Sequence, residues 1–281
     1  MRKIEIHPVF WAVFAIAIAT AHFLELLVLL VIILIHEIGH AVAASFFSWR
    51  VRKISLLPFG GVAEMDEHGN RPLREEGIVI LAGPAQHLWM IGLAFLVFQG
   101  GWLSEEAFFV FLKYNLMILF FNMLPIWPLD GGKLLFLYVS LKLPFSKAFQ
   151  QTLAISAGAV AVFAGMVLLI EPLNLNVWIV LSFLAFSLYF ERKQSRYTFM
   201  RFLMERYYGK NEDLRKLKPL VVPHDALVVA VLEQFQRGCK HPIIIEQNGK
   251  EKGTLDENEL LHAFFTEKLV SAKVGDLLYD Y

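Results

Sequence analysis

The sequence predicts a mainly α-helical, polytopic membrane protein with six transmembrane helices and a small C-terminal α/β domain. Hydrophobic residues make up 57% of the 281 residues, charged residues make up 19%, and the mean hydropathy is +0.53. These values exceed those of an ordinary soluble globule and exclude intrinsic disorder, which requires low hydrophobicity. The apolar residues gather in runs close to the length of about 20 residues that crosses a bilayer.

The charge and cysteine counts exclude several classes of function. The 26 Lys and Arg residues balance the 26 Asp and Glu residues, so no positive excess points to direct nucleic-acid binding. The single cysteine, Cys239, excludes an internal disulfide framework and any metal site with several cysteine ligands. A metal site in this chain would therefore have to use histidine and carboxylate.

The apolar runs define the expected spans. The first run is too long for one spanning helix, and the polar residues at 20–25 divide it into a hairpin. The first of the two resulting helices is short for a full crossing. The expected spans are residues 8–21, 24–47, 78–98, 107–124, 153–170 and 173–190.

The charges of the loops predict the orientation of these spans. Lys and Arg residues flank one side, whereas the opposite loops at 20–25, 99–106 and 171–176 contain none. By the positive-inside rule, both termini face the cytoplasm. Lys113 is the exception, since it falls inside the fourth span near its outer end, where a long side chain can snorkel to the interface.

The chain after the last span is predicted to differ in character. The predicted division is 1–190 for the membrane domain, 191–218 for a basic juxtamembrane linker and 219–281 for a small cytoplasmic domain. The linker carries nine Lys and Arg residues against four Asp and Glu residues. It is predicted to be a helix that lies at anionic lipid headgroups or docks a substrate.

The last of these segments has the pattern of a small α/β unit. A strand is expected at residues 220–222, followed by a helix that Asp225 caps and that runs to about Gln236. Gln247-Asn248-Gly249-Lys250 predicts a hairpin turn, and a second helix is expected to begin at Asp256.

The second span contains His36-Glu37-Ile38-Gly39-His40, which is the pattern H-E-x-x-H. Positions i and i+4 lie on one face of a helix, so both imidazoles can bind one Zn²⁺, and Glu37 can accept a proton from the attacking water. Chance gives roughly 0.02 matches in a chain of this composition. Each ionisable residue in a membrane helix costs on the order of 3 kcal/mol, so helix packing alone explains the cluster poorly.

Catalytic zinc sites usually take three protein ligands, and the best third ligand is Asp130. The fourth span, which precedes Asp130, runs in the same direction as the second, so the two motifs lie at similar depth. Pro125 and Pro128 break the helix before Asp130. Gly131 and Gly132 are expected to make the backbone after Asp130 irregular. Irregular backbone at membrane depth is tolerated only where it is buried in protein or lines a water-filled cavity, which is where a hydrolytic zinc site would lie.

Other polar or flexible positions have weaker claims. His87 is a lone histidine interpreted mainly as a packing residue. Asn122 either binds the backbone of a substrate or cross-links helices. Gly60 and Gly61 lie between the second and third spans, either in an edge strand that pairs with an unfolded substrate or in an ordinary interfacial loop.

These residues resemble the site-2 proteases, a family of intramembrane zinc metalloproteases. The resemblance runs over nearly the whole chain, and it is closest to a sporulation branch of that family. It implies that His36, His40 and Asp130 bind one zinc ion and that Glu37 is the general base. The matching elements are His36–His40, Gly60-Gly61, Ala82-Gly83-Pro84, Asn122-x-x-Pro125 and Leu129-Asp130-Gly131.

The same resemblance implies a substrate, partners and a location. The substrate would be pro-sigma-K, a membrane-associated precursor of a transcription factor. Two membrane partners, of the stage IV sporulation protein FA and bypass-of-forespore types, would hold the protease inactive. The protein would lie in the mother-cell membrane that surrounds the forespore, in contact with membrane lipid.

The C-terminal segment resembles a single CBS domain, a module that can bind adenine nucleotides such as ATP. CBS domains often place a Thr and an Asp where they meet a ribose, and the corresponding positions here read Asp256 and Glu259. Two carboxylates would repel phosphate. CBS domains usually occur in pairs, so the single copy implies pairing in a homo-oligomer or with the substrate.

Other functions stay open at this point. A site-2-type protease could act on another membrane-tethered substrate. A membrane metal transporter would need ionisable residues on several spans leading to both faces, and the outer halves of these spans are nearly free of them. A non-catalytic scaffold with the same fold would have no need of Glu37.

Overall fold

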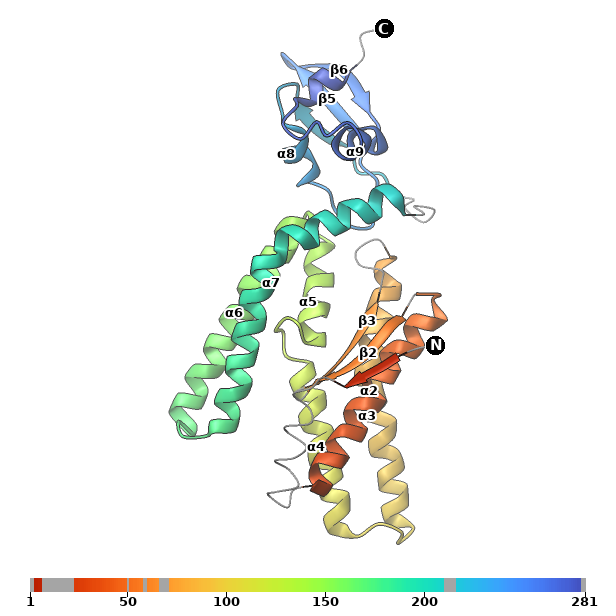
Figure 1. The fold of residues 1–281 in the computed structure, drawn as a ribbon, viewed down its shortest axis with the longest axis vertical. Coiled ribbons are helices and arrows are strands. Elements are labelled where there is room, and N and C mark those ends of the chain that lie inside the picture. The colour runs from red at the N-terminus through yellow and green to blue at the C-terminus, as the bar shows by residue number, and fades with distance from the viewer. Residues whose placement is uncertain are drawn as a thin grey trace. The chain divides into compact units, whose positions relative to one another are not determined.

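The computed structural model describes residues 3–6, 23–49, 51–57, 60–65, 71–209 and 216–278. The first predicted span, at residues 8–21, lies outside these ranges. Figure 1 shows the elements, which are β1 (Lys3–Ile6), α2 (Phe23–Phe46), β2 (Val51–Leu57), β3 (Gly60–Met65), α3 (Leu73–Gln99), α4 (Glu105–Asn122), α5 (Asp130–Ser140), α6 (Phe145–Ile170), α7 (Leu175–Tyr208), β4 (Leu220–Pro223), α8 (Val228–Leu232), β5 (Ile243–Gln247), β6 (Lys250–Leu255), α9 (Glu257–Phe265) and a 3₁₀ helix (Val274–Leu277).

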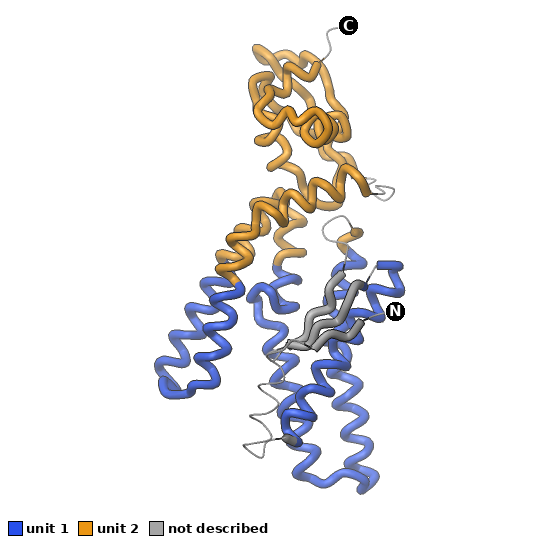
Figure 2. The backbone as a smooth tube through the Cα atoms, viewed as in Figure 1, with its two compact units in different colours: residues 1–67, 74–135, 155–187 blue, residues 68–73, 136–154, 188–281 orange. Residues whose placement is uncertain are grey.

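The chain forms two compact units (Figure 2). Unit 1 contains residues 1–67, 74–135 and 155–187, and unit 2 contains residues 68–73, 136–154 and 188–281. Helices α5, α6 and α7 each contribute residues to both units. The division of the chain at residues 190 and 218 stays a prediction.

Four helices in the described ranges are long and apolar enough to cross a membrane, namely α2, α3, α6 and α7. They overlap the second, third, fifth and sixth predicted spans and indicate an integral membrane protein. Helix α4 coincides with the fourth predicted span, but it carries Glu105, Glu106 and Lys113 and is not one of the four. The structure therefore supports four of the six expected spans.

Several helices extend beyond the apolar runs that predicted them. Helix α6 begins at Phe145, before its run, and α7 continues without interruption from the last run through the basic segment to Tyr208. The predicted basic helix is thus the continuation of the last span. Hydropathy marks only the lipid-facing part of a helix, whereas backbone hydrogen bonding continues into the interface.

Helices α2, α3 and α4 pack together in unit 1 (Figure 1). Ile32 and Ile33 of α2, Met90 of α3 and Ile118 of α4 are buried in one cluster. A three-stranded sheet of order β1-β2-β3 lies beside α2, with β1 parallel to β2 and β2 antiparallel to β3. Of the two readings of the Gly60-Gly61 segment, the strand is the one found, and β3 lies at an edge of this sheet.

Unit 2 contains a second sheet of order β4-β5-β6, with β4 parallel to β5 and β5 antiparallel to β6. Asn248 and Gly249 have positive φ angles of 54° and 74°, which suit the predicted Asn-Gly turn between β5 and β6. Asp256 caps α9, and Glu259 completes a capping box with it. The predicted hairpin and the start of the second helix are therefore confirmed.

The predicted helix capped by Asp225 is wrong in its bounds. Helix α8 covers only Val228–Leu232, and its N-cap is Leu227, without a side-chain hydrogen bond. The backbone N–H of Val228 donates to Ala272, and that of Val274 donates to Ala226. Residues 224 and 225 form a turn, and this pairing then holds Leu227 in an extended conformation, so the helix starts later than the capping signal suggests.

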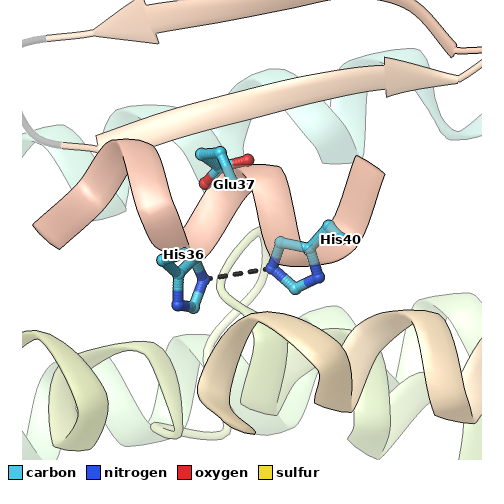
Figure 3. Close-up of side chains that lie close together, drawn as sticks. All are labelled: His36, Glu37 and His40. Carbon is cyan, nitrogen blue, oxygen red and sulfur yellow. Dashed lines mark hydrogen bonds between the residues drawn. The ribbon is translucent and has the colours of Figure 1, made fainter. Parts of the chain in front are cut away.

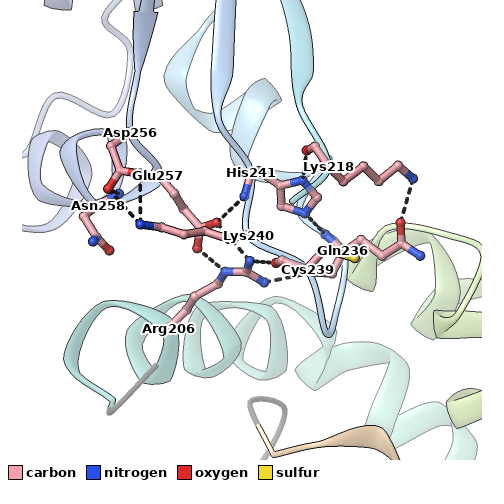
Figure 4. A network of polar contacts seen from close by, with 9 residues as sticks. All are labelled: Arg206, Lys218, Gln236, Cys239, Lys240, His241, Asp256, Glu257 and Asn258. Carbon is pink, nitrogen blue, oxygen red and sulfur yellow. Dashed lines mark hydrogen bonds and ion pairs between the residues drawn. The ribbon is translucent and has the colours of Figure 1, made fainter. Parts of the chain in front are cut away.

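A buried ion pair joins the end of α7 to α9 within unit 2 (Figure 4). The Arg206 side chain, 0% exposed, donates to both carboxylate oxygens of Glu257 and to the carbonyls of Gln236 and Cys239. Glu257 also accepts the backbone N–H of His241 at 2.7 Å. Removing one partner of such a pair leaves an uncompensated buried charge and typically costs about 3–5 kcal/mol.

The stability of unit 2 is predicted to depend on the protonation of His241. Its Nε2 accepts the backbone N–H of Gln236 at 2.9 Å, and its Nδ1 donates to the carbonyl of Lys218 at 2.8 Å. Burial is the main cause that lowers the pKa of His241 below its usual 6.5. Because the unfolded chain takes up a proton that the folded chain resists, stability is unaffected above pH 6.5 and falls as the pH drops below it.

Hydrogen exchange of residues 216–278 in the full-length protein, corrected for intrinsic rates between pH 7.5 and 5, would measure this loss. A His241→Gln variant should lose the pH dependence. An equal slope in both proteins would contradict the role of His241.

Candidate metal centre

The structure brings the three predicted metal ligands together inside unit 1. His36 and His40 project from one face of α2, and Asp130 begins α5. Oδ2 of Asp130 lies 3.0 Å from Nε2 of His36 and 3.1 Å from Nε2 of His40, and the two Nε2 atoms lie 3.0 Å apart. All three side chains are buried, with exposed fractions of 3%, 5% and 3%.

This triangle of donor atoms fits a zinc ion. Tetrahedral zinc has bonds of about 2.0–2.1 Å to nitrogen and oxygen, which places neighbouring ligand atoms about 3.3 Å apart. The atoms of His36, His40 and Asp130 are already at nearly that spacing. Two imidazole nitrogens and one carboxylate oxygen form the donor set of a catalytic zinc site rather than of a closed structural one.

Glu37 lies on the same turn of α2 as the two histidines. Figure 3 shows both rings on one side of the helix and Glu37 on another side. Glu37 is buried, and one of its carboxylate oxygens lies within 4.8 Å of a ring nitrogen of each histidine. The three residues therefore form a compact group that can hold a metal and place a carboxylate base beside it.

Helix α3 approaches the histidine rings so closely that only glycine fits at position 83. A Cβ atom at Gly83 would lie 2.8 Å from Cε1 of His36 and closer still to the His40 ring. One turn earlier, the carbonyl of Val79 accepts the Nδ1 hydrogen of His40 at 2.8 Å. This bond leaves Nε2 of neutral His40 without a proton and available to a metal.

The loop that carries Asp130 is held by α6. The hydroxyl of Ser156 accepts the backbone N–H of Trp127 at 3.0 Å and donates to the carbonyl of Pro125 at 3.3 Å. Lys133, one turn into α5, contacts Oδ1 of Asp130 at 3.1 Å. Since Lys133 engages Oδ1, Oδ2 is the oxygen that faces the histidines.

The expected irregular backbone after Asp130 is not found. Gly131 and Gly132 lie in the first turn of α5. A Cβ at Gly131 would lie 2.5 Å from the carbonyl carbon of Met123, and one at Gly132 would lie 2.5 Å from that of Ile126. The glycines are required by the close approach of the preceding loop to the new helix.

The predicted substrate-binding residues lie at the end of α4 and in the β2–β3 hairpin. Asn122 is the last residue of α4, is half-buried, and its side chain makes no hydrogen bond to the described part of the chain. Gly60 and Gly61 pair with Leu57 and Leu56 across the β2–β3 hairpin. Binding of substrate by these three residues stays a prediction.

Sequence reasoning missed the contact between His87 and the metal cluster. Nε2 of His87 lies 3.0 Å from Nδ1 of His36, and Nδ1 of His87 lies 2.7 Å from Oδ1 of Asn115. The available signal was the spacing from Gly83, because i and i+4 share one face of a helix. His87 therefore lies on the same face of α3 as Gly83 and contacts His36.

We predict that Gly83→Ala lowers zinc occupancy by roughly tenfold or more, because the methyl group displaces the ligand rings. Metal analysis of the purified protein would measure the loss. Gly92→Ala is the matched control, since a Cβ at Gly92 on the same helix meets nothing within 4 Å. Normal zinc content in Gly83→Ala would contradict the steric argument.

The chain is similar to several known proteins. Residues 24–103 and 99–170 match peptidase family M50. Stage IV sporulation protein FB of Bacillus subtilis is 50% identical over 279 residues, which cover 99% of this chain and 97% of that protein. A zinc metalloprotease of Methanocaldococcus jannaschii is 27% identical over 253 residues, which cover 89% of this chain and 68% of that protein.

The fold agrees with these matches. The solved structure of the site-2 protease from Methanocaldococcus jannaschii superposes with a TM-score of 0.52 at 27% identity, over 68% of this chain and 89% of that chain. The buried group of His36, Glu37 and His40 is a candidate metal site of the kind that a metalloprotease requires. The chain therefore belongs to peptidase family M50, the site-2 protease family of zinc metalloproteases.

Proposed function

We propose that His36, His40 and Asp130 bind the catalytic zinc ion and that Glu37 is the general base of peptide-bond hydrolysis. The observation that carries this assignment is the convergence of two Nε2 atoms and one carboxylate oxygen within 3.0–3.1 Å of one another. The buried carboxylate of Glu37, close to both histidines, supports its role as the base.

The chemistry follows from this arrangement. When bound, zinc polarises the scissile carbonyl and lowers the pKa of water toward 7. Glu37 accepts the proton of the attacking water and passes it to the leaving amine. Asp130, oriented by Lys133, stays ionised and holds its oxygen toward the histidines. The buried surroundings of these side chains strengthen each electrostatic interaction.

A transmembrane substrate has to unwind before cleavage, because the carbonyls of a helix are hydrogen-bonded and shielded. We propose that Gly60 and Gly61 of β3 pair with the extended substrate and that Asn122 binds its backbone. The position of β3 at a sheet edge supports this, since an edge strand can accept a further strand. The side chain of Asn122, without a hydrogen bond to the described residues, is free to take this role.

The substrate that we propose is a pro-sigma-K-like precursor, whose cleavage would activate transcription in the mother cell during sporulation. Identity of 50% to stage IV sporulation protein FB across almost the full length supports this choice. On the same basis, inhibitory membrane partners of the stage IV sporulation protein FA and bypass-of-forespore types would regulate the enzyme in the membrane around the forespore.

We also propose six spans with both termini in the cytoplasm and a CBS-like domain at 219–281. The distribution of Lys and Arg between the loops supports this orientation. In the tail, Asp256 and Glu259 both serve the N-terminal cap of α9, and Lys240 pairs with Asp256. Since these carboxylates are engaged in the fold, they offer no site for a nucleotide phosphate. Native mass measurement in mild detergent would test pairing in a homo-oligomer.

Co-expression with the host's pro-sigma-K-like precursor in a non-sporulating bacterium tests the function. The wild-type protein should shorten the precursor on an immunoblot. Glu37→Gln should keep its zinc and lose cleavage by roughly 100-fold or more, because proton transfer loses its base. Cleavage by both proteins would contradict the role of Glu37, and cleavage by neither would contradict the proposed substrate.

Replacing Asp130 tests the third ligand. Asp130→Ala should lower zinc content by roughly tenfold or more in metal analysis, because catalytic zinc is held by three protein ligands. Glu105→Gln, an exposed carboxylate at the start of α4, is the control and should keep normal zinc. Normal zinc retention in Asp130→Ala would contradict the assignment.

A further inference from the structure

A line of hydrogen bonds leaves the metal cluster through the far side of the His36 ring. Nε2 of His36 faces Asp130 and His40, while its Nδ1 lies 3.0 Å from Nε2 of His87 on α3. Nδ1 of His87 lies 2.7 Å from Oδ1 of Asn115 on α4. His87 and Asn115 are both 0% exposed. Three helices of unit 1 thus meet along one polar line.

Metal binding at Nε2 of His36 and the acceptor oxygen of Asn115 decide which nitrogen of each histidine donates its hydrogen. A histidine that binds a metal through Nε2 carries its proton on Nδ1. His36 then donates to Nε2 of His87, whose own proton is on Nδ1 and is donated to the oxygen of Asn115. The reverse direction would put a proton on Nε2 of His36, which would block the metal.

The two histidines of the cluster are supported differently. Nδ1 of His40 donates to the carbonyl of Val79, which can only accept, so one bond settles its tautomer. His87 can donate or accept, so a further group has to settle its direction. Asn115 does so by presenting its oxygen to His87, although this leaves its own Nδ2 buried without a partner in the described structure.

We propose that His87 and Asn115 are positioning residues that fix the ring orientation and the tautomer of His36 for zinc. This inference rests on the proposed role of His36 as a ligand. Partners of this kind hold a metal-binding imidazole in place, and their loss typically lowers metal affinity 10–100-fold. A mere cross-link between α3 and α4 would not require the line to reach His36.

The test is zinc affinity, measured by competition with a chromophoric chelator on the purified full-length protein in detergent. His87→Leu and Asn115→Leu remove the support and should weaken zinc binding by roughly 10–100-fold. Asn115→Asp keeps an acceptor for His87 and should stay within about threefold of wild type. Thr152→Val is the matched control, since its buried hydroxyl donates to the Ala148 carbonyl of its own helix and has no other hydrogen-bond partner among the described residues.

The pair of Asn115 variants separates positioning from packing. Equal losses in Asn115→Leu and Asn115→Asp would overturn the proposal, as would wild-type affinity in His87→Leu. If His87→Leu does not fold, comparing the zinc affinities of Asn115→Leu and Asn115→Asp still tests the proposal. The absorption spectrum of the Co²⁺-substituted protein should change in Asn115→Leu and be preserved in Asn115→Asp, because it reports the arrangement of the ligands.

The outcome also separates this inference from the proposed function. If the His36→Ala variant binds zinc as tightly as the wild-type protein, the proposed metal site itself is contradicted. If the His36→Ala variant loses zinc but the His87→Leu variant keeps wild-type affinity, only the role of the positioning residues is overturned.

Discussion

The structure depends on the convergence of three acceptor atoms at one buried point. The Nδ1 hydrogen of His40 is committed to the carbonyl of Val79, so neutral His40 presents a bare Nε2. That atom faces Oδ2 of Asp130 and Nε2 of His36 at 3.0–3.1 Å. Three such atoms repel one another unless a proton or a metal ion lies among them, and the low dielectric of the interior increases the repulsion.

The surrounding elements keep these atoms from moving apart. Gly83 lets α3 press against both imidazoles, and Gly131 lets the loop before Asp130 fold back onto α5. Ser156 of α6 ties this loop through Trp127, and Lys133 holds the outer oxygen of Asp130. The glycines allow the backbone to approach the site closely, and the polar contacts then fix the orientation of the side chains. A site built on packed helices in this way is preorganised before any substrate arrives.

The parts of this site that the sequence predicts are those set by local geometry. His36 and His40 share a helix face by their spacing, and Asp130 follows a span that runs in the same direction. The need for glycine at Gly131 comes from the Met123 carbonyl, a contact between two segments that no local pattern shows. Strand β1 also depends on a distant contact, because the parallel partner of Lys3 is Lys53. The helix after Asp225 starts late for a similar reason, because the backbone before it pairs with residues 272–274.

The two buried charge clusters differ in the hydrogen-bond donors that face their carboxylates. In unit 2, the guanidinium of Arg206 supplies donors to Glu257 and to two carbonyls, so acceptors and donors match without any ion. In unit 1, Lys133 contacts Oδ1 of Asp130, whereas Oδ2 of Asp130 and the Nε2 atoms of His36 and His40 have only one another at hydrogen-bond distance among the described residues. The first arrangement is complete as a structural link. We propose that a zinc ion completes the second arrangement, and that the polar residues around it orient its ligands.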